Sequence, residues 1–307
     1  MMPLMSPEPT GLPRACSRRR LLAGLGAGLG LGLLAGSPAL AATSERMPIV
    51  VSDDVLRDYR RFLAGREPLE VQDFGGPHGR RDVAELVLLH KALAEGGGPR
   101  STELLERPTS TRLKADLRAG VGACTGTSYW RRDFDDEDPD LLFSQPVLEN
   151  GEFEVGLYTL PGNHLAQSAR GLDDLRRLRL LSNREWRVDW ETLVQLGLGD
   201  RLYHVSNWSN MPRMLQGGRA DALLAPFQPG ADMALQVDGI TLLPIRGLKI
   251  SMRGTRHYVL SRRHPDMATL LRQLDTGLQN LRRSGLIRQA YTQSGFFHPE
   301  VKRWTRL

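Results

Sequence analysis

Cysteine is almost absent from the 307-residue chain, which contains only Cys16 and Cys124. Cys16 lies inside an N-terminal segment organised as an export signal, so the exported part would keep Cys124 alone. One cysteine cannot form an internal disulfide or provide the paired thiolates of a zinc site. Cys124 lies in an apolar run, which predicts a buried small apolar residue rather than a nucleophile. A chain of this length can build a sufficient hydrophobic core without disulfides.

The compact motifs of common enzymes are also missing. The sequence has no Gly-x-Ser-x-Gly nucleophile elbow, no phosphate loop ending in Gly-Lys-Ser/Thr and no dinucleotide fingerprint after a strand. Its seven histidines are scattered, without a His-x-His or His-x-x-x-His pair for a metal. A catalytic triad assembled from distant residues stays open, because triads need not be local. We expect a protein that is not an enzyme and that needs no metal or cofactor.

The net positive charge is small once the N-terminal segment is set aside. The formal net charge is +6, and residues 1–41 contribute four arginines and one glutamate to it, which leaves +3 for the other 266 residues. So small an excess, spread along the chain, does not favour nucleic acid as a partner. A length of 266 residues suits one large domain or two medium ones.

Residues 1–41 have the three parts of a cleavable export signal. Arginines at 14 and 18–20 precede an uncharged run at 21–36, and Ala-Leu-Ala at 39–41 offers a cleavage site. The run is shorter than the roughly 20 apolar residues of a membrane span, although an uncleaved anchor is the alternative. Ser-Arg-Arg-Arg-Leu-Leu at 17–22 resembles the twin-arginine export motif, with an ordinary secretory signal as the alternative. We expect a periplasmic protein.

The exported part alternates between short apolar runs and helical patterns. In its first half, strands are predicted at 47–51, 69–71, 101–105 and 121–124, and helices at 55–64, 82–94 and 111–119. Asp82, followed by Glu85, predicts a capping box at the second helix. This order is typical of a parallel sheet with helices on its faces. A second unit of the same kind follows, with strands at 152–159, 178–181, 202–205, 222–224, 240–245, 248–252 and 258–260, and the end of the chain is helical.

Residues 121–147 are the best candidate for a ligand site. The apolar run ends in Thr125, Gly126, Thr127 and Ser128, and two arginines, residues 131 and 132, come next. A strand followed by a small polar turn and a helix start can aim N–H groups at an anion, and a guanidinium can clamp a carboxylate. An ordinary turn with surface arginines is the alternative. The acidic run at 133–140 lacks the glycine and terminal glutamate of a calcium loop, so a solvated loop is favoured.

Four further segments occur in a characteristic order. They are Leu-Arg-Ala-Gly-Val at 117–121, Leu-Phe-Ser-Gln-Pro-Val at 142–147, Met-Leu-Gln-Gly-Gly-Arg-Ala-Asp-Ala at 214–222, and His-Pro-Asp at 264–266 before a long helix. Together they resemble periplasmic solute-binding proteins of the type II fold, of the family-3 kind that includes amino-acid binders. The resemblance implies an α/β protein with two lobes, mixed sheets flanked by helices, and a hinge of two crossing segments near 151–158 and 256–260. It predicts lobe 1 at 42–151, lobe 2 at 152–255, and a return to lobe 1 with C-terminal helices at 256–307.

The resemblance also implies a ligand site between the lobes. In amino-acid binders an arginine after the lobe-1 turn holds the ligand carboxylate, and Arg131 and Arg132 are the nearest matches. The acidic run places them farther from the Phe-Ser pair at 143–144 than in that family, and no aspartate matches the family's partner for the ligand's amino group. The expected ligand-binding residues are Phe74, Gly75, Thr125, Gly126, Thr127, Ser128, Arg131, Arg132, Trp208, Ser209, Asn210 and Phe227. Plain packing is the alternative for the aromatic members.

The function implied is capture of a small polar or anionic solute, amino-acid-like or an organic acid, for delivery to a membrane permease of an ABC transport system. We expect a monomer. One alternative is a ligand-sensing or accessory protein for a periplasmic receptor or oxidoreductase. Another is a periplasmic enzyme on the same fold, such as a dehydratase, for which His78 is the one hint of a general base.

Overall fold

The computed structural model describes residues 46–134 and 138–307. The expected export signal at 1–41 and three acidic residues, at 135–137, lie outside the described residues. Within the described part of the chain, no helix has the length and apolar character needed to cross a membrane.

The strands of the first sheet are β1 (Met47–Ser52), β2 (Thr102–Arg107), β3 (Cys124–Thr125), β5 (Leu141–Phe143) and β14 (Val259–Ser261). Their order is β2-β1-β3-β14-β5. β1 pairs in parallel with β2 and β3, whereas β14 runs antiparallel to β3 and β5. Parallel pairing places the carboxyl ends of β1, β2 and β3 at one edge of the sheet, where such sheets bind ligands.

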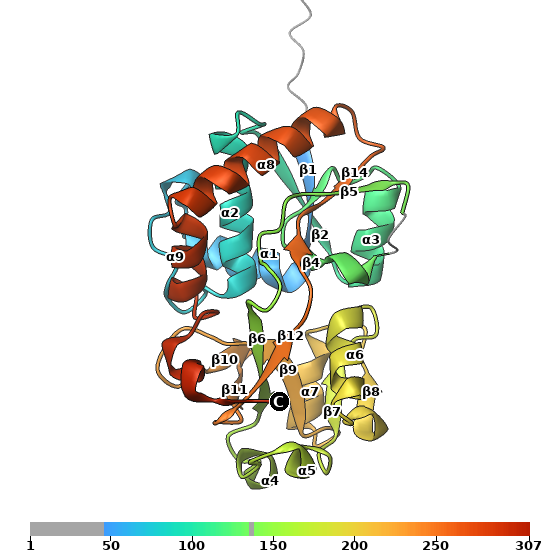
Figure 1. Cartoon of the computed structure of the whole chain (residues 1–307), viewed down its shortest axis with the longest axis vertical. Helices are drawn as coiled ribbons and strands as arrows, with labels where there is room; N and C mark the ends of the chain where they lie inside the picture. The colour runs from blue at the N-terminus through green and yellow to red at the C-terminus, as the bar shows by residue number, and fades with distance from the viewer. Residues whose placement is uncertain (1–45, 135–137) are drawn as a thin grey trace, which may run out of the picture. The chain divides into compact units, whose positions relative to one another are not determined.

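Helices α1 (Asp53–Leu63), α2 (Arg81–Glu95), α3 (Ser110–Arg118), α8 (Met267–Arg283) and α9 (Leu286–Gln293) accompany this sheet. Helix α3 starts at an N-cap, Thr109, whose hydroxyl accepts the backbone N–H of Arg112 at 3.2 Å. Figure 1 shows α8 crossing α2. The two helices approach closely at Gly277, which has no side chain. A Cβ there would lie 1.8 Å from the Ala92 carbonyl oxygen, so any side chain would force the helices apart.

The strands of the second sheet are β6 (Phe153–Thr159), β7 (Leu180–Ser182), β8 (Leu202–His204), β9 (Ala222–Pro226), β10 (Leu235–Val237), β11 (Ile240–Pro244), β12 (Leu248–Met252) and β15 (Thr305–Arg306). The main path is β10-β11-β6-β9-β7-β8, and β12 pairs with β6 and β15. Helices α4 (His164–Gln167), α5 (Leu172–Leu175), α6 (Arg187–Gln195) and α7 (Asn210–Gln216) accompany it. The two sheets with their helices are the two lobes (Figure 1).

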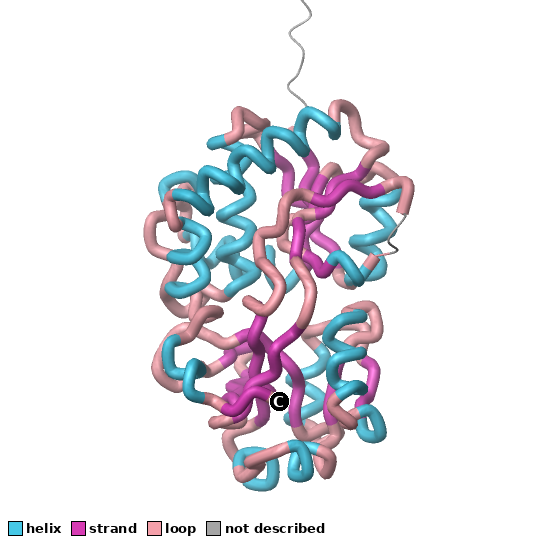
Figure 2. The backbone as a smooth tube through the Cα atoms, viewed as in Figure 1, coloured by secondary structure: helices cyan, strands magenta, loops and turns pink. Residues whose placement is uncertain are grey.

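Two segments cross between the lobes side by side, residues 144–152 and 253–258 (Figure 2). They are hydrogen-bonded to each other: Val147 N–H donates to the Arg256 carbonyl at 2.8 Å, and Arg256 N–H donates to that of Leu148 at 3.0 Å. The second segment contains β13 (Arg256–His257), which pairs with β4 (Tyr129–Trp130) of the first lobe. After α9 the chain crosses once more, because β15 joins β12. The lobe limits drawn from the sequence stay a prediction.

Several local expectations were wrong. Residues 69–71 are not a strand: they fall in and just after the 3-10 turn η1 (Pro68–Glu70). β3 is shorter than predicted because the N–H groups of Val121 and Gly122 donate to the Asp116 carbonyl and so finish helix α3. The C-terminal helices expected from the sequence are present as α8 and α9, and the tail after them, for which no element was predicted, holds the 3-10 turn η4 (Pro299–Arg303) and the strand β15. The capping box is absent because the N-cap of α2 is Arg80, and the Asp82 and Glu85 side chains bind arginines instead.

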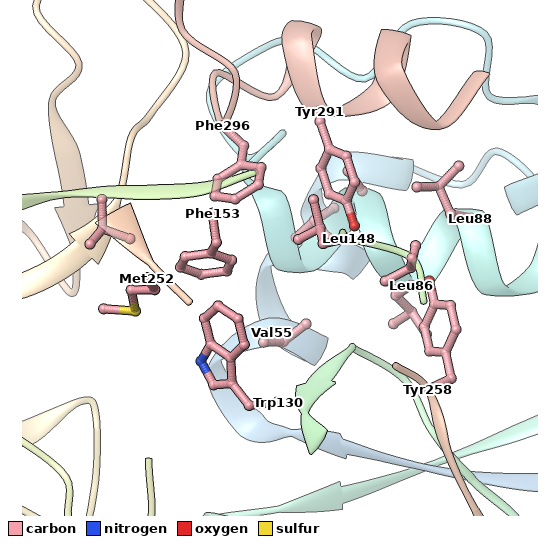
Figure 3. Close-up of a cluster of buried hydrophobic side chains, with 14 of the residues drawn as sticks. Val55, Leu86, Leu88, Trp130, Leu148, Phe153, Met252, Tyr258, Tyr291 and Phe296 are labelled. Carbon is pink, nitrogen blue, oxygen red and sulfur yellow. The ribbon is translucent and has the colours of Figure 1, made fainter. Parts of the chain in front are cut away.

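Aromatic packing fills the junction of the lobes, as Figure 3 shows. The ring of Trp130 from β4 lies 4.7 Å from that of Phe153 at the start of β6, and Phe153 lies 4.9 Å from Phe296 of the last crossing. Phe296 in turn packs 5.2 Å from Tyr291 of α9. Side chains of both lobes therefore share one continuous core.

Candidate functional site between the lobes

A cavity of about 150 Å³ lies between the two lobes. Ser52 and Pro108, at the carboxyl ends of β1 and β2, line it from the first lobe, and Pro226 at the end of β9 lines it from the second. This volume accommodates roughly ten water molecules, or a small organic solute. The cavity occupies the position that open α/β sheets use for ligands.

Aromatic side chains of both lobes form much of the cavity wall. They are Tyr129, Trp130, Phe153, Trp186 and Trp208. The rings of Trp186 and Trp208 lie 6.2 Å apart on the second lobe, tilted by 47°. The Trp186 Nε1–H donates across the cleft to the Ser110 hydroxyl at 3.1 Å, so one edge of this indole is fixed by the opposite lobe. A wall of aromatic rings with a few placed polar groups is typical of small-molecule sites.

A group of ion pairs surrounds the start of α2 on the first lobe. The Arg80 guanidinium donates to Asp54 at 2.6 Å, to Asp58 at 2.9 Å and to Asp82 at 2.8 Å. Arg81 donates to Asp82 and, at 3.1 Å, to the fully buried Glu85. Burial opposes ionisation of Asp82, but Arg81 and Arg80 outweigh it and hold the pKa of that carboxyl below its usual value.

Glu85 fixes the turn that the sequence singled out. Its carboxylate accepts the backbone N–H and the hydroxyl of Ser128, each at 2.8 Å, and the Tyr291 hydroxyl at 3.1 Å. The Thr125 hydroxyl accepts the N–H of Val259 at 3.0 Å, which ties the same turn to β14. The small polar turn thus owes its conformation to partners inside the first lobe.

Arg256 reaches this turn from the second crossing segment. Its Nε donates to the Ser128 hydroxyl at 3.0 Å and its Nη2 to the Ser128 carbonyl. The guanidinium lies 4.9 Å from the ring centres of both Trp130 and Phe153, a stacking arrangement that suits arginine. Among the described residues, Nη1 of Arg256 has no hydrogen-bond partner, and the side chain lines the cavity.

Two aspartates meet the cavity from opposite lobes. Asp133 belongs to the 3-10 turn η2 (Arg131–Asp133) of the first lobe, and Asp189 to α6 of the second. Asp189 accepts the Trp130 Nε1–H at 3.0 Å, and Asp133 accepts the Val188 N–H at 3.4 Å. Within residues 46–134 and 138–307, no lysine or arginine forms an ion pair with either carboxylate. Burial raises the pKa of Asp133 to about 7 and raises that of Asp189 above its usual value.

The lobes touch directly around the cavity. The Lys114 ammonium of α3 donates to the Asp133 carbonyl at 2.9 Å and to the Glu185 carbonyl at 3.0 Å. Arg132 pairs with Glu191 of α6 at 2.6 Å. At the rim, Arg57 of α1 lies 3.4 Å from Asp238 in the turn between β10 and β11. These contacts describe a closed arrangement of the two lobes.

The structure places the predicted ligand-binding residues in different surroundings. Thr127, Ser128 and Trp208 line the cavity. Thr125 and Gly126 lie in the same turn, where a Cβ on Gly126 would meet Val51 at 2.7 Å. Gly75, Ser209 and Asn210 are not part of the wall that the described residues form. The ligand-binding role of all twelve predicted residues stays a prediction.

The remaining predicted residues have other partners. Phe74 and Phe227 are fully buried, and Phe227 packs 5.4 Å from Trp304. The Arg131 guanidinium lies 3.8 Å from the centre of the Phe143 ring, and Arg132 pairs with Glu191 as described. His78, the hint of a general base, lines an adjoining groove at the cleft rim, 4.0 Å from Asp58.

Sequence reasoning missed most of the charged wall. The missed residues include Asp53, Asp54, Arg80, Arg81, Asp82, Asp133, Asp189 and Arg256. A usable signal existed for the two aspartates at 53 and 54, because only Ser52 separates them from the end of a predicted strand. Asp133 was assigned to a solvated run although it is buried. In the described part of the chain, no group of three His, Cys, Asp or Glu side chains is placed to hold a metal ion.

Comparison with solved structures identifies the fold. An amino acid ABC transporter substrate-binding protein from Streptococcus pneumoniae, solved with L-arginine, matches with a TM-score of 0.53 at 14% identity, covering 81% of this chain and 93% of that one. The BvgS VFT2 domain from Bordetella pertussis matches with a TM-score of 0.51 at 15% identity, covering 80% and 91%. A probable amino-acid ABC transporter extracellular-binding protein from Bacillus subtilis gives 0.50 at 14% identity, covering 82% and 99%.

No protein-family model and no curated protein matches the chain. The structural matches nevertheless span both lobes, so the two-lobed type II periplasmic-binding fold expected from the sequence is confirmed.

Proposed function

We propose that this protein is an exported solute-binding protein that holds a small polar solute between its lobes and delivers it to a membrane transporter. The observation that carries the proposal is the cavity between the lobes, because residues at the carboxyl ends of strands in both sheets line it. The fold is shared with a substrate-binding protein of an amino acid ABC transporter, which supports a binding role rather than an enzymatic one.

The proposed cycle depends on contacts that only the closed form makes. A solute that touches both walls favours closure, because it gains its second set of contacts when the lobes meet. The crossing segments at 144–152 and 253–258 are joined by backbone hydrogen bonds and bend together as one hinge. Export through a cleaved twin-arginine signal, a permease as partner and a monomeric state belong to the same proposal and are supported by residues 1–41 and by the fold.

Binding is tested by isothermal titration calorimetry and thermal unfolding of the purified protein with amino acids, polyamines and organic acids. A genuine ligand at a hundredfold excess over its Kd should stabilise the protein by about 2.7 kcal/mol. Trp208→Ala removes a cavity wall and should weaken binding. The control is Tyr203→Ala, an exposed aromatic residue of the same lobe outside the cavity wall. Equal affinity of both variants, or no binder in any pool, would contradict the proposal.

A further inference from the structure

We infer that the solute carries a positive charge, as an amine or guanidinium group, and that this group lies between the carboxylates of Asp133 in the first lobe and Asp189 in the second. This inference rests on the proposed function and narrows its ligand class. Both aspartates line the same cavity, and each comes from a different lobe. A cation between them would therefore join the lobes directly.

The charges of the cavity wall favour a cation over an anion. The wall contains the aspartates at 53, 54, 82, 133 and 189 and the arginines at 80, 81 and 256. Five carboxylates against three guanidinium groups leave a negative wall. In a cavity of restricted solvent access such an excess attracts positive charge and repels negative charge more strongly than it would in water.

The arginines at the start of α2 are already neutralised by protein carboxylates. Arg80 binds three aspartates, and Arg81 binds Asp82 and Glu85. A solute carboxylate would have to compete with these partners, which are held in place by the fold. The atoms left for it are the Nε of Arg81, buried without a partner among the described residues, and the Nη1 of Arg256. These two atoms can donate to an acidic group of the same solute, but the net negative charge of the cavity wall favours a cationic group.

Asp133 and Asp189 have the opposite surroundings. Each carboxylate accepts one protein N–H, at 3.4 Å from Val188 and 3.0 Å from Trp130 respectively. Lys114 and Arg256 act electrostatically on Asp133, and Arg256 and Arg81 act on Asp189. None of these three side chains forms an ion pair with either carboxylate within the described residues. Enclosing an unbalanced carboxylate costs free energy unless a partner compensates it. Burial is the main cause of the raised pKa of both carboxyls, and the nearby cationic side chains do not offset it.

Aromatic rings beside the two aspartates suit the same group. Arg256 covers the ring of Trp130, whereas Trp186 and Trp208 line the cavity from the second lobe without an arginine or lysine stacked on them in the described structure. Indole faces attract ammonium and guanidinium groups most strongly when water is excluded. Carboxylates from both lobes and two indoles on one wall form a consistent cation site.

The first arm of the test compares charges by titration calorimetry. L-lysine, L-arginine and putrescine are the cationic probes, and L-glutamate and succinate are the anionic ones. We expect binding from the cationic set, with the anionic probes at least tenfold weaker. Binding of glutamate or succinate in preference to all three cations would overturn this inference while leaving solute binding intact. Absence of binding by every probe, and by the broader pools, would overturn the proposed function itself.

The second arm removes each carboxylate without changing its shape, using Asp133→Asn and Asp189→Asn. Loss of a charge partner in the cavity should weaken the best cationic probe about 30-fold or more. Asp173→Asn, an exposed aspartate of α5 in the second lobe, is the matched control and should bind within twofold of the parent protein. Parent-like cation affinity in both cavity variants overturns the inference.

Stability of the same variants separates a binding role from a structural one. If a carboxylate stabilises the fold, its removal lowers the unfolding midpoint. Asp133 and Asp189 have no ion-pair partner among the described residues, so their Asn variants should unfold at the same temperature as the parent or higher, without ligand, while binding the cation more weakly. A lower midpoint together with unchanged affinity would show that the two carboxylates serve the fold.

Discussion

The two clusters of carboxylates in this cleft differ in how their charges are balanced. Around Arg80 and Arg81, aspartates and Glu85 are joined to guanidinium groups within a single lobe. At the lobe junction, Asp133 and Asp189 face each other's lobes without an ion-pair partner in the described structure. The ion pairs of the first arrangement join residues of one lobe, whereas the second arrangement brings together residues of both lobes.

This difference separates groups that build the site from groups that are available to a ligand. A fully satisfied buried network fixes geometry and resists substitution, because removal of one member leaves the others unpaired. An incompletely balanced pair is costly to the protein alone and becomes favourable when a solute completes it. The presence of charge in a cavity is therefore less informative than whether that charge already has a partner.

The largest effect is expected in the satisfied network. Glu85→Ala should lower the free energy of unfolding by about 3–5 kcal/mol, because it leaves Arg81 with one less partner and Ser128 and Tyr291 without their acceptor. Glu95→Ala, an exposed glutamate of the same helix, is the control and should change it by less than about 0.5 kcal/mol. Denaturant unfolding measures both, and a loss at Glu85 no larger than that at Glu95 would contradict the structural role of the network around Arg81.

The pH dependence of stability should identify the unbalanced pair. The folded pKa of Asp133 is raised to about 7 from a usual value of 3.8, so between these values the folded state holds a proton that the unfolded state has lost. Stability from this group is thus lost as pH rises through that window, by up to about 1.4 kcal/mol per pH unit. Asp133→Asn should remove this slope. Denaturant unfolding at pH 5, 6 and 7 without ligand measures it, and an unchanged slope contradicts the assignment.

The affinity for a cationic probe should rise with pH, whereas the stability contributed by Asp133 falls. A bound cation favours the ionised form of Asp133, so binding below pH 7 should release a proton and strengthen as pH rises, by at most about tenfold per unit. Asp189, Arg256 and Lys114 surround the same carboxyl and act on the same titration. Calorimetry of the best cationic probe in buffers of different ionisation enthalpy measures proton release. Proton uptake on binding would be incompatible with a cation at this site.

Much of the fold was predictable from local patterns. The alternation of strands and helices follows from the spacing of apolar residues. The two-lobed architecture was predicted from four short segments that resemble those of a known family, and such segments are recognisable because turns and helix ends depend on local residue types. Asp82 shows the limit of such patterns. It has the sequence context of a helix cap, but Arg80 and Arg81 provide a stronger partner and helix α2 begins without it.

The charged wall was less predictable because it is assembled by tertiary structure. Asp133 and Asp189 lie in different lobes, and nothing local indicates that closure brings both to one cavity. Arg256 reaches Ser128 only because β13 pairs with β4. Conversely, the sequence singles out Thr127 and Ser128, which line the cavity, because a polar turn after an apolar run is a local feature. The hydrogen bonds of Ser128 to Glu85 and Arg256 depend on tertiary contacts, which local sequence patterns do not indicate.

The smallest effect is expected at an arginine that the sequence favoured as an anion clamp. Arg132 pairs with Glu191 at 2.6 Å, yet its side chain is 54% exposed, so the pair should contribute only about 0.2–1 kcal/mol to stability. Arg132→Ala should therefore change the unfolding midpoint little and leave the affinity of a cationic probe within twofold. Glu191→Ala, which breaks the same pair from the other lobe, should match it in both measurements. If Arg132→Ala alone weakened binding of a glutamate or succinate probe more than tenfold, the anion clamp predicted from the sequence would be supported. The arginines, and not Asp133 and Asp189, would then be the groups that recognise the charge of the solute.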